Sequence, residues 1–183
     1  MIKFIKLQDK HLQTVLDWRV QPEIAQFMLS EFDYCIDKQR VWFNKISTDK
    51  TMAYWIVEYQ GVLIGLINLA AIDILAKKCN AGFYIGDIKY RQLTAFLLPY
   101  FYNFIFKKLK FKKIYGEVLG SNESILKIHT MQGYRHVGTF KNHIFKNGHY
   151  VDVHLVELMR DDWLLQKRYQ RYEAEFEDVI WQV

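Results

Sequence analysis

The chain has 183 residues, of which 51% are hydrophobic and 16% aromatic, which is enough for one well-packed domain and too few for two. It contains only two prolines and nine glycines, and this composition excludes long disordered linkers. The net charge of +5 suits an acidic partner, such as the phosphates of CoA or of a nucleotide, and it equally suits a charged surface that only provides solubility.

The two cysteines, Cys35 and Cys79, form no Cys-x-x-Cys motif and have no zinc-like spacing with histidine. We therefore expect reduced thiols and no metal site. The first residues lack the apolar segment and cleavage site of a signal peptide, and no window approaches 18 uninterrupted apolar residues. These features predict a soluble, cytoplasmic protein with no membrane partner.

The first third of the chain predicts one strand followed by three helices. Residues 2–7 alternate apolar and basic side chains, as a strand does. Asp9 is expected to cap a helix that ends near Arg19, and Pro22 suits the first position of a second helix. A third helix is expected at 37–46.

The middle of the chain predicts three strands and a long helix. The strands are expected at 52–59, 62–73 and 81–86, with a short hairpin turn at Gln60–Gly61 and a polar turn at 76–80. The long apolar helix is expected at 94–109.

The segment from Ile114 to Tyr134 predicts a strand, a capped helix and the start of another strand. Gly120 interrupts the first strand, Ser121 or Asn122 is expected to cap a helix, and Gly133 is expected to end it. Two closing strands are expected at 134–140 and 150–159, around a turn at Asn147–Gly148. Beyond them, apolar residues at three- and four-residue spacings predict a terminal amphipathic helix, packed on its own domain or at a dimer contact: Leu165, Tyr169, Tyr172, Phe176 and Val179.

This order of elements, with Asn122, Gly133 and Tyr134, resembles the GCN5-related N-acetyltransferase family over residues 2–163. The resemblance implies an α/β fold with a mixed, mostly antiparallel sheet, splayed central strands, flanking helices and an extra C-terminal helix. It implies an acetyltransferase domain at 1–163, followed by the terminal helix at 164–183.

Two stretches are similar to one branch of this family. Trp18-Arg19 followed by Pro22 resembles a signature shared by ribosomal-protein N-terminal acetyltransferases and the amino-sugar N-acetyltransferases of pseudaminic acid biosynthesis. Residues 145–155 are similar to the closing hairpin of the same branch. The resemblance implies Trp18, Arg19 and His154 as candidates for the acceptor site.

The resemblance also implies where acetyl-CoA binds. A backbone N–H near Tyr84 or Ile85, on a strand that is bulged in the family, would polarise the thioester carbonyl, and Asn122 would contact the cofactor or the splayed strand. The start of the long helix would hold the pyrophosphate through Arg91, Gln92, Leu93, Thr94 and Ala95. Thr94 and Phe96 replace small residues of the family's phosphate loop, so binding that is weakened, reshaped or lost is an alternative.

His129 occupies the position of the family's acidic tyrosine and could donate or accept a proton, or simply pack in the helix. Asp73 is the candidate base, with turn capping as its alternative, while Glu58 and Glu117 could simply face solvent. His143, His149 and His154 flank the closing hairpin without the spacing of a metal site. No nucleophile motif is present, which favours direct acetyl transfer.

The resulting hypothesis is an N-acetyltransferase that acts on a nucleotide-linked deoxyamino sugar of the UDP-4-amino-sugar type. The alternatives are a protein N-terminal acetyltransferase and an inactive relative that binds a partner. The basic run at 107–113 lacks a base-stacking motif, so no nucleic-acid partner is expected.

Overall fold

The computed structural model describes residues 2–30 and 33–177. A seven-stranded sheet with the order β1-β2-β3-β4-β5-β7-β6 forms its centre, and every neighbouring pair is antiparallel except β4 and β5. The strands are β1 (Ile2–Lys6), β2 (Ala53–Tyr59), β3 (Val62–Asp73), β4 (Lys78–Ile85), β5 (Lys113–Leu119), β6 (Arg135–Lys146) and β7 (His149–Met159). This sheet confirms the predicted mixed, mostly antiparallel architecture.

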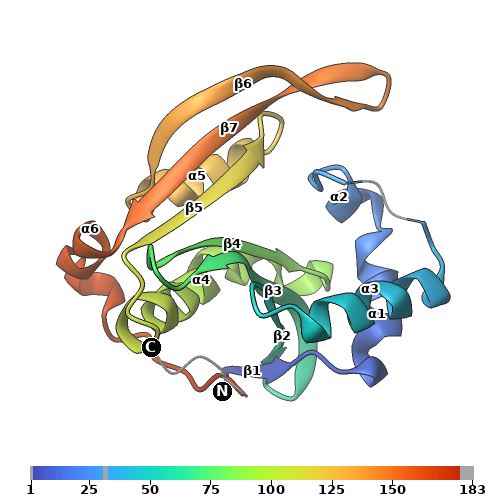
Figure 1. Cartoon of the computed structure of the whole chain (residues 1–183), viewed down its shortest axis with the longest axis horizontal. Helices are drawn as coiled ribbons and strands as arrows, with labels where there is room; N and C mark the ends of the chain where they lie inside the picture. Colours follow the sequence, from blue (N-terminus) through green and yellow to red (C-terminus); the bar gives the residue numbers. More distant parts are fainter. Residues whose placement is uncertain (1, 31–32, 178–183) are drawn as a thin grey trace.

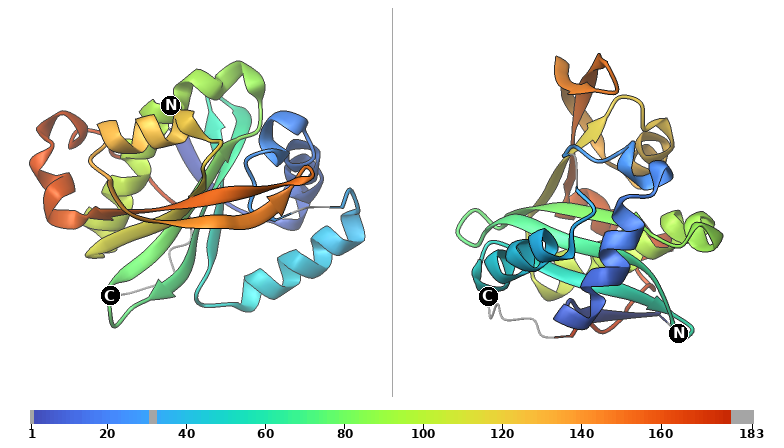
Figure 2. Two further views of the ribbon diagram at one scale, coloured as in Figure 1. Left: turned by 90° about the horizontal axis from the view of Figure 1, so that it is seen from above. Right: turned by 90° about the vertical axis from the view of Figure 1, so that its right-hand side faces the viewer.

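Helices cover both faces of the sheet (Figures 1 and 2). The helices α1 (Leu12–Arg19), α2 (Pro22–Ala25) and α3 (Ile36–Thr48) lie on one side, and α4 (Thr94–Asn103) and α5 (Glu123–Met131) lie on the other. Alternation along the strands divides the core accordingly, since Ile56 and Leu66 pack with α1 and α3, whereas Val57 and Ile67 pack with α4. The short helix α6 (Arg160–Leu165) follows β7.

The predicted turns and caps are confirmed where the signal was local. Gln60 and Gly61 have φ values of 52° and 84°, and Asn147 and Gly148 have 50° and 80°, which fits tight hairpin turns. Asn122 caps α5 by accepting a hydrogen bond from the Ile125 amide, and Gly133 follows the helix with φ of 90°.

Several predicted boundaries are wrong. Asp9 does not cap α1, because it begins a 3-10 helix, Asp9–His11, whose N-cap is Gln8. The predicted polar turn at 76–80 is partly strand, since β4 begins at Lys78. The long helix predicted at 94–109 begins at Thr94 as expected, but it divides into α4 and a π-helix (Phe104–Lys108), and a 3-10 helix (Ile88–Leu93) precedes it.

The prediction of a terminal amphipathic helix is also wrong. The chain leaves α6 at Leu165, forms a 3-10 helix at Lys167–Tyr169, and then pairs with β1 through a bridge between Phe4 and Phe176. The Phe176 ring stacks on Phe4 and Phe104, at centroid distances of 4.1 and 3.8 Å. These residues therefore offer no continuous helical face to a second copy of the chain, and Val179 lies outside the described residues.

Candidate functional site

The strands β4 and β5 separate in the middle of the sheet. They pair only where Lys78, Cys79 and Asn80 meet 113–115, and they diverge beyond that point (Figure 1). Two adjoining cavities of about 500 and 340 Å³ occupy the opening. Both are lined by Phe27, Met28, Phe83, Tyr84, Asn122 and Ile125. The splayed geometry predicted for the central strands is present, and it opens a cleft that several predicted site residues line.

The edge of β4 presents backbone amides to this cleft. The Gly86 amide donates to the Ile64 carbonyl on β3 at 2.8 Å. Because peptide groups alternate along a strand, the amides of Phe83 and Ile85 point the other way, toward β5. The Ile85 amide therefore faces the cleft as predicted, whereas the Tyr84 amide faces β3. At the end of the predicted strand the amides of Gly86 and Asp87 both donate to the Ile64 carbonyl, at 2.8 and 3.2 Å, as in a β-bulge. A second irregularity lies in β3, where the register with β4 shifts between Ala70 and Asp73.

The smaller cavity holds a cationic side chain at the start of α4. Arg91 and Thr94 line it together with Ser124 of α5. The Arg91 Nη2 atom is buried and has no hydrogen-bond partner among the described residues. A buried guanidinium nitrogen without a partner fits an anionic group such as a phosphate, because such a group would satisfy both its charge and its donor.

The backbone around Arg91 differs from the predicted phosphate loop. Residues 88–93 form a 3-10 helix, and the Thr94 hydroxyl donates to the Arg91 carbonyl at 2.8 Å. Gln92, Leu93 and Ala95 line neither cavity. Phe96, which the sequence placed in the path of a phosphate, instead packs edge-to-face against Tyr100 and Tyr172. The candidate anion site thus depends on the Arg91 side chain rather than on a glycine-like loop.

His129 lies in the wall of the larger cavity. It is only 7% exposed, its ring is 4.2 Å from that of Tyr134, and its Nδ1 atom is buried without a partner among the described residues. Burial lowers the pKa of His129 to about 4, because the charged imidazolium loses its hydration. The imidazole is therefore neutral near pH 7, with one nitrogen available to a ligand.

The depressed pKa of His129 should make stability fall in acid. The unfolded chain takes up this proton below about pH 6.5, whereas the folded chain takes it up only near pH 4, so stability is lost as the pH falls between these values. We expect His129 to contribute a loss of about 2 kcal/mol between about pH 7 and pH 5. Urea unfolding of the wild type and of His129→Phe, each at about pH 7 and about pH 5, measures this loss of stability. His136→Phe, at an exposed position, is the control, and a pH dependence unchanged in His129→Phe would contradict the prediction.

Arg19 and Glu117 are the charged residues of the larger cavity. Arg19 ends α1, and its Nη2 atom donates to the Ser30 hydroxyl at 3.1 Å. Burial lowers the pKa of Arg19, although Arg19 stays charged at neutral pH. Glu117 lies on β5 and is exposed at the cleft. The cavity therefore places one cation and one carboxylate around a space that could hold a small polar molecule.

Besides Gln92, Leu93 and Ala95, three further predicted site residues lie outside both cavities. Asp73 caps the turn after β3 by accepting from the Ala76 amide at 2.8 Å, and it lines neither cavity. Trp18 is a core residue whose ring fills the space beside Gly86, where a Cβ atom would approach it to 2.1 Å. His154 lies outside both cavities, with its Nδ1 atom 3.0 Å from the Thr139 hydroxyl.

Sequence reasoning missed Phe83 and undervalued Glu117. In the sequence, Glu117 looks like an ordinary residue of an alternating strand. It lines the cavity only because β5 separates from β4. The direction of the Phe83 amide can be inferred because Phe83 lies two residues before Ile85, but only once the direction of one peptide group in the strand is known.

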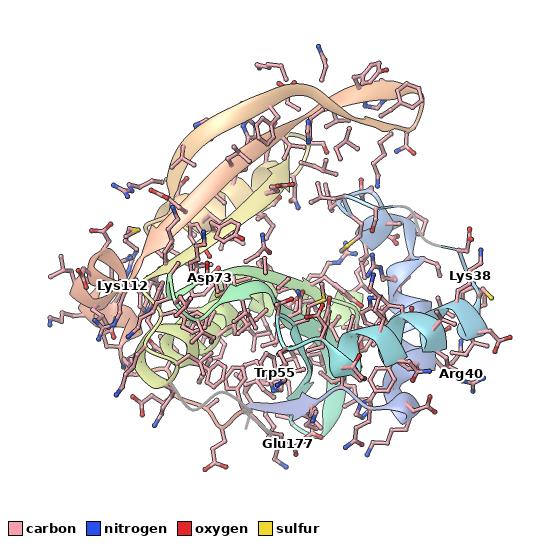
Figure 3. All side chains as sticks on the ribbon, in the orientation of Figure 1. Lys38, Arg40, Trp55, Asp73, Lys112 and Glu177 are labelled. Atoms are coloured by element: carbon pink, nitrogen blue, oxygen red, sulfur yellow. The ribbon has the colours of Figure 1, made fainter. Side chains whose placement is uncertain are left out.

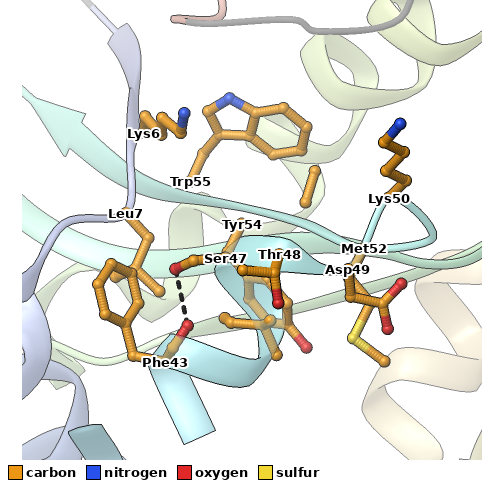
Figure 4. A pocket seen from close by; sticks show the side chains of 12 residues that line it. Lys6, Leu7, Phe43, Ser47, Thr48, Asp49, Lys50, Met52, Tyr54 and Trp55 are labelled. Carbon is orange, nitrogen blue, oxygen red and sulfur yellow. Dashed lines mark hydrogen bonds between the residues drawn. The ribbon is translucent and has the colours of Figure 1, made fainter.

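A third cavity of about 110 Å³ lies between β1, β2 and the end of α3 (Figure 4). The Ser47 hydroxyl donates to the Phe43 carbonyl at its edge, at 2.7 Å. None of the predicted site residues lines this cavity. A further cavity of about 510 Å³ beside α2 and the end of β6 includes Arg19 but no other predicted site residue. The splayed cleft, which brings most of the predicted site residues together, is therefore the candidate functional site.

Comparisons with known proteins agree with this geometry. The family model described as an acetyltransferase (GNAT) domain matches residues 2–155. The acetyltransferase PseH of Campylobacter jejuni strain 81-176 is 24% identical over 127 residues, which are 69% of this chain and 78% of that protein. The same enzyme from strain NCTC 11168 is 25% identical over 128 residues, with the same coverage.

Solved structures show the same fold. A spermidine N-acetyltransferase from Vibrio cholerae in complex with CoA and spermine superposes with a TM-score of 0.83 at 21% identity, covering 89% of this chain and 98% of that one. A dodecameric structure of the spermidine enzyme from the same organism gives 0.77 at 20% identity, covering 89% and 96%.

Proposed function

Because the chain belongs to the acetyltransferase (GNAT) family, we propose that it acetylates the amino group of a nucleotide-linked deoxyamino sugar, of the UDP-4-amino-sugar type, with acetyl-CoA as donor. The observation that carries the proposal is Arg19, a half-buried cation in the wall of the larger cavity. A nucleotide sugar carries phosphates that a guanidinium binds through paired hydrogen bonds. The similarity to two PseH acetyltransferases supports the same acceptor class.

The charges of the larger cavity argue against a polyamine as acceptor. A polyamine carries several ammonium groups, and each would require a nearby carboxylate in a partly dry site. Among residues 2–30 and 33–177, Glu117 is the only carboxylate that lines this cavity. One carboxylate and one guanidinium instead suit a molecule with a single amine and a distant anionic group.

The residues of the cleft supply distinct parts of the proposed reaction. Acetyl-CoA, when bound, supplies the acetyl group as a thioester. The Ile85 amide would donate a hydrogen bond to the thioester carbonyl, the Phe83 amide would pair with the pantetheine chain, and Arg91 would bind a phosphate. Glu117 would take a proton from the acceptor ammonium, and His129 would hold its N–H toward the departing sulfur. A C–N bond forms and a C–S bond breaks, and the second amine proton passes to the CoA sulfur, so that CoA leaves as a thiol with no covalent enzyme intermediate.

An acceptor comparison tests this function. With acetyl-CoA present, a UDP-linked 4-amino-4-deoxysugar, spermidine and a peptide with a free N-terminus are each supplied to the purified chain, and the release of free thiol is measured. We expect the nucleotide sugar to give the highest kcat/KM. A higher value with spermidine or with the peptide would overturn the proposal.

Replacing Arg19 should separate acceptor binding from donor binding. We expect Arg19→Gln to raise the KM for the nucleotide sugar by about ten- to a hundredfold, because a charge-assisted hydrogen bond to phosphate is lost. The KM for acetyl-CoA should stay unchanged, since Arg19 does not line the smaller cavity. Arg40→Gln, on the exposed side of α3, is the matched control. An equal change in both KM values would contradict the assigned role.

A further inference from the structure

The turn between β3 and β4 exposes two large aliphatic side chains. Residues 74–77 form this turn, in which Leu75 is 97% exposed and Ile74 is 41% exposed. Figure 2 shows the hairpin projecting from the body of the molecule. A single exposed leucine is ordinary, but two adjacent aliphatic side chains at a projecting tip form an apolar point that a partner can bury.

Lysines follow this tip in the sequence and also lie on the neighbouring segment. Lys77 and Lys78 follow it directly, and the Lys77 carbonyl accepts hydrogen bonds from the amides of Lys112 and Lys113, at 2.7 and 3.3 Å. The segment that ends there also exposes Lys108 and Lys110. The turn and this segment are therefore neighbours in space, although they lie far apart along the chain.

Most of these lysines are not neutralised. Lys77, Lys108, Lys110 and Lys112 form no ion pair with another described residue. The acidic residues nearby have partners of their own: Asp73 lies 4.0 Å from Lys78, Glu157 lies 2.5 Å from Lys113, Glu173 lies 3.4 Å from Lys107, and Asp161 lies 3.8 Å from Arg160. Asp162 is exposed beside Asp161 at the start of α6. The region keeps an excess of positive charge around the apolar tip.

We propose that this end of the molecule binds the surface of an anionic lipid membrane. Ile74 and Leu75 would enter the boundary between headgroups and acyl chains, while Lys108, Lys110 and Lys112 would contact anionic headgroups. An apolar tip within a basic collar has the chemistry of such a surface, because each part meets a matching layer of the bilayer. A nucleic acid would match the lysines and leave Leu75 in water.

The position of this surface is compatible with activity. β4 and β5 pair beside the lysines, and the cleft opens from that point toward the opposite ends of both strands. Figure 3 places Asp73 and Lys112 at one end of the molecule, and Lys38 and Arg40 of α3 at the other. The proposed contact therefore leaves the cleft accessible to its substrates. It concerns association with a surface only: among the described residues, no helix is long and apolar enough to cross a membrane.

Vesicle co-sedimentation tests the proposal. The full chain is mixed with vesicles of phosphatidylcholine alone, or with about one third phosphatidylglycerol, at low and high salt. We expect binding to the anionic vesicles only, weakened by salt. Leu75→Asp should weaken it by about tenfold or more, and the triple variant Lys108→Glu, Lys110→Glu, Lys112→Glu by about a hundredfold.

The control makes one substitution of each kind on α3, where Val41 and Lys45 are both exposed. Val41→Asp with Lys45→Glu should bind the vesicles like the wild type. Acetyl transfer in solution should be unchanged in every variant, which shows that each one folds. Absence of binding to anionic vesicles, or binding that Leu75→Asp leaves unchanged, would overturn the proposal. Binding to a DNA duplex without binding to vesicles would also overturn it and assign the lysines to nucleic acid.

Discussion

Glu117→Gln is expected to lower kcat/KM for acetyl transfer by about a hundred- to a thousandfold, with unchanged affinity for acetyl-CoA. An acceptor amine arrives as an ammonium ion near pH 7 and must lose a proton before it can attack. Glu117 is the only carboxylate that lines the larger cavity in the part of the chain that the structure describes, and its exposure at the cleft allows it to accept that proton directly or through one water molecule. Glutamine keeps the size of the side chain and removes its basicity.

Two measurements make this prediction specific. Asp73→Asn changes the other carboxylate that was a candidate base, and it should leave the rate unchanged because Asp73 caps a turn. Raising the pH should restore part of the rate of Glu117→Gln, since more of the amine is then already neutral. An Asp73→Asn rate that falls as far as that of Glu117→Gln would place the base at Asp73 instead.

The local features of this fold could be predicted from the sequence. Gln60–Gly61, Asn122 and Gly133 each determine the conformation of a few neighbouring residues, so their signal lies within one short window. The separation of β4 from β5 was predicted through family resemblance alone. Strand periodicity indicates which residues alternate, but it does not indicate where a partner strand departs.

The predictions that were wrong concern contacts between segments that are distant along the chain. Tyr169, Tyr172 and Phe176 have helical spacing, yet Phe176 stacks on Phe4 and Phe104, from the first strand and from the middle of the chain. Burial of those rings outweighs a weak helical preference in the last residues. Phe96 shows the same effect, because its ring packs against the Tyr172 ring instead of lining the cleft.

The C-terminal segment connects the two helices beside the smaller cavity. Gln166 donates to the Gln132 carbonyl at 2.7 Å, and Arg168 donates to the Met131 carbonyl at 2.7 Å, so the segment holds the end of α5. Gln132 in turn donates to the Ala95 carbonyl in α4, at 3.0 Å. The position of His129, on α5, therefore depends on residues that follow the closing hairpin.

Asn103 links α4 to the same segment, and Asn103→Ala is expected to lower the free energy of unfolding by about 3 kcal/mol. Its side chain is 2% exposed, and its Nδ2 atom donates to the carbonyls of Tyr169 and Tyr172, each at 2.8 Å. Its Oδ1 atom accepts from the Trp163 Nε1 atom, also at 2.8 Å. Alanine would leave the buried indole N–H without a partner, and it would remove the amide donor from the Tyr169 and Tyr172 carbonyls, of which Tyr169 also accepts from the Tyr172 amide at 3.3 Å. The orphaned indole N–H is the costly group, because it is buried.

Urea unfolding of Asn103→Ala and of Asn44→Ala, at an exposed position of α3, measures this cost. Trp163→Phe removes the indole donor, so the double variant Asn103→Ala, Trp163→Phe should be more stable than the sum of the two single losses predicts. Additive losses would show that the Asn103–Trp163 hydrogen bond contributes little. A loss in Asn103→Ala no larger than in Asn44→Ala would contradict the role of Asn103 altogether. With the predicted coupling, the buried Asn103 amide is one of the contacts through which the closing segment stabilises α4. Truncation before Tyr169 should then destabilise the fold more than Asn103→Ala does, because it also removes the Phe176 ring that stacks on Phe4 and Phe104.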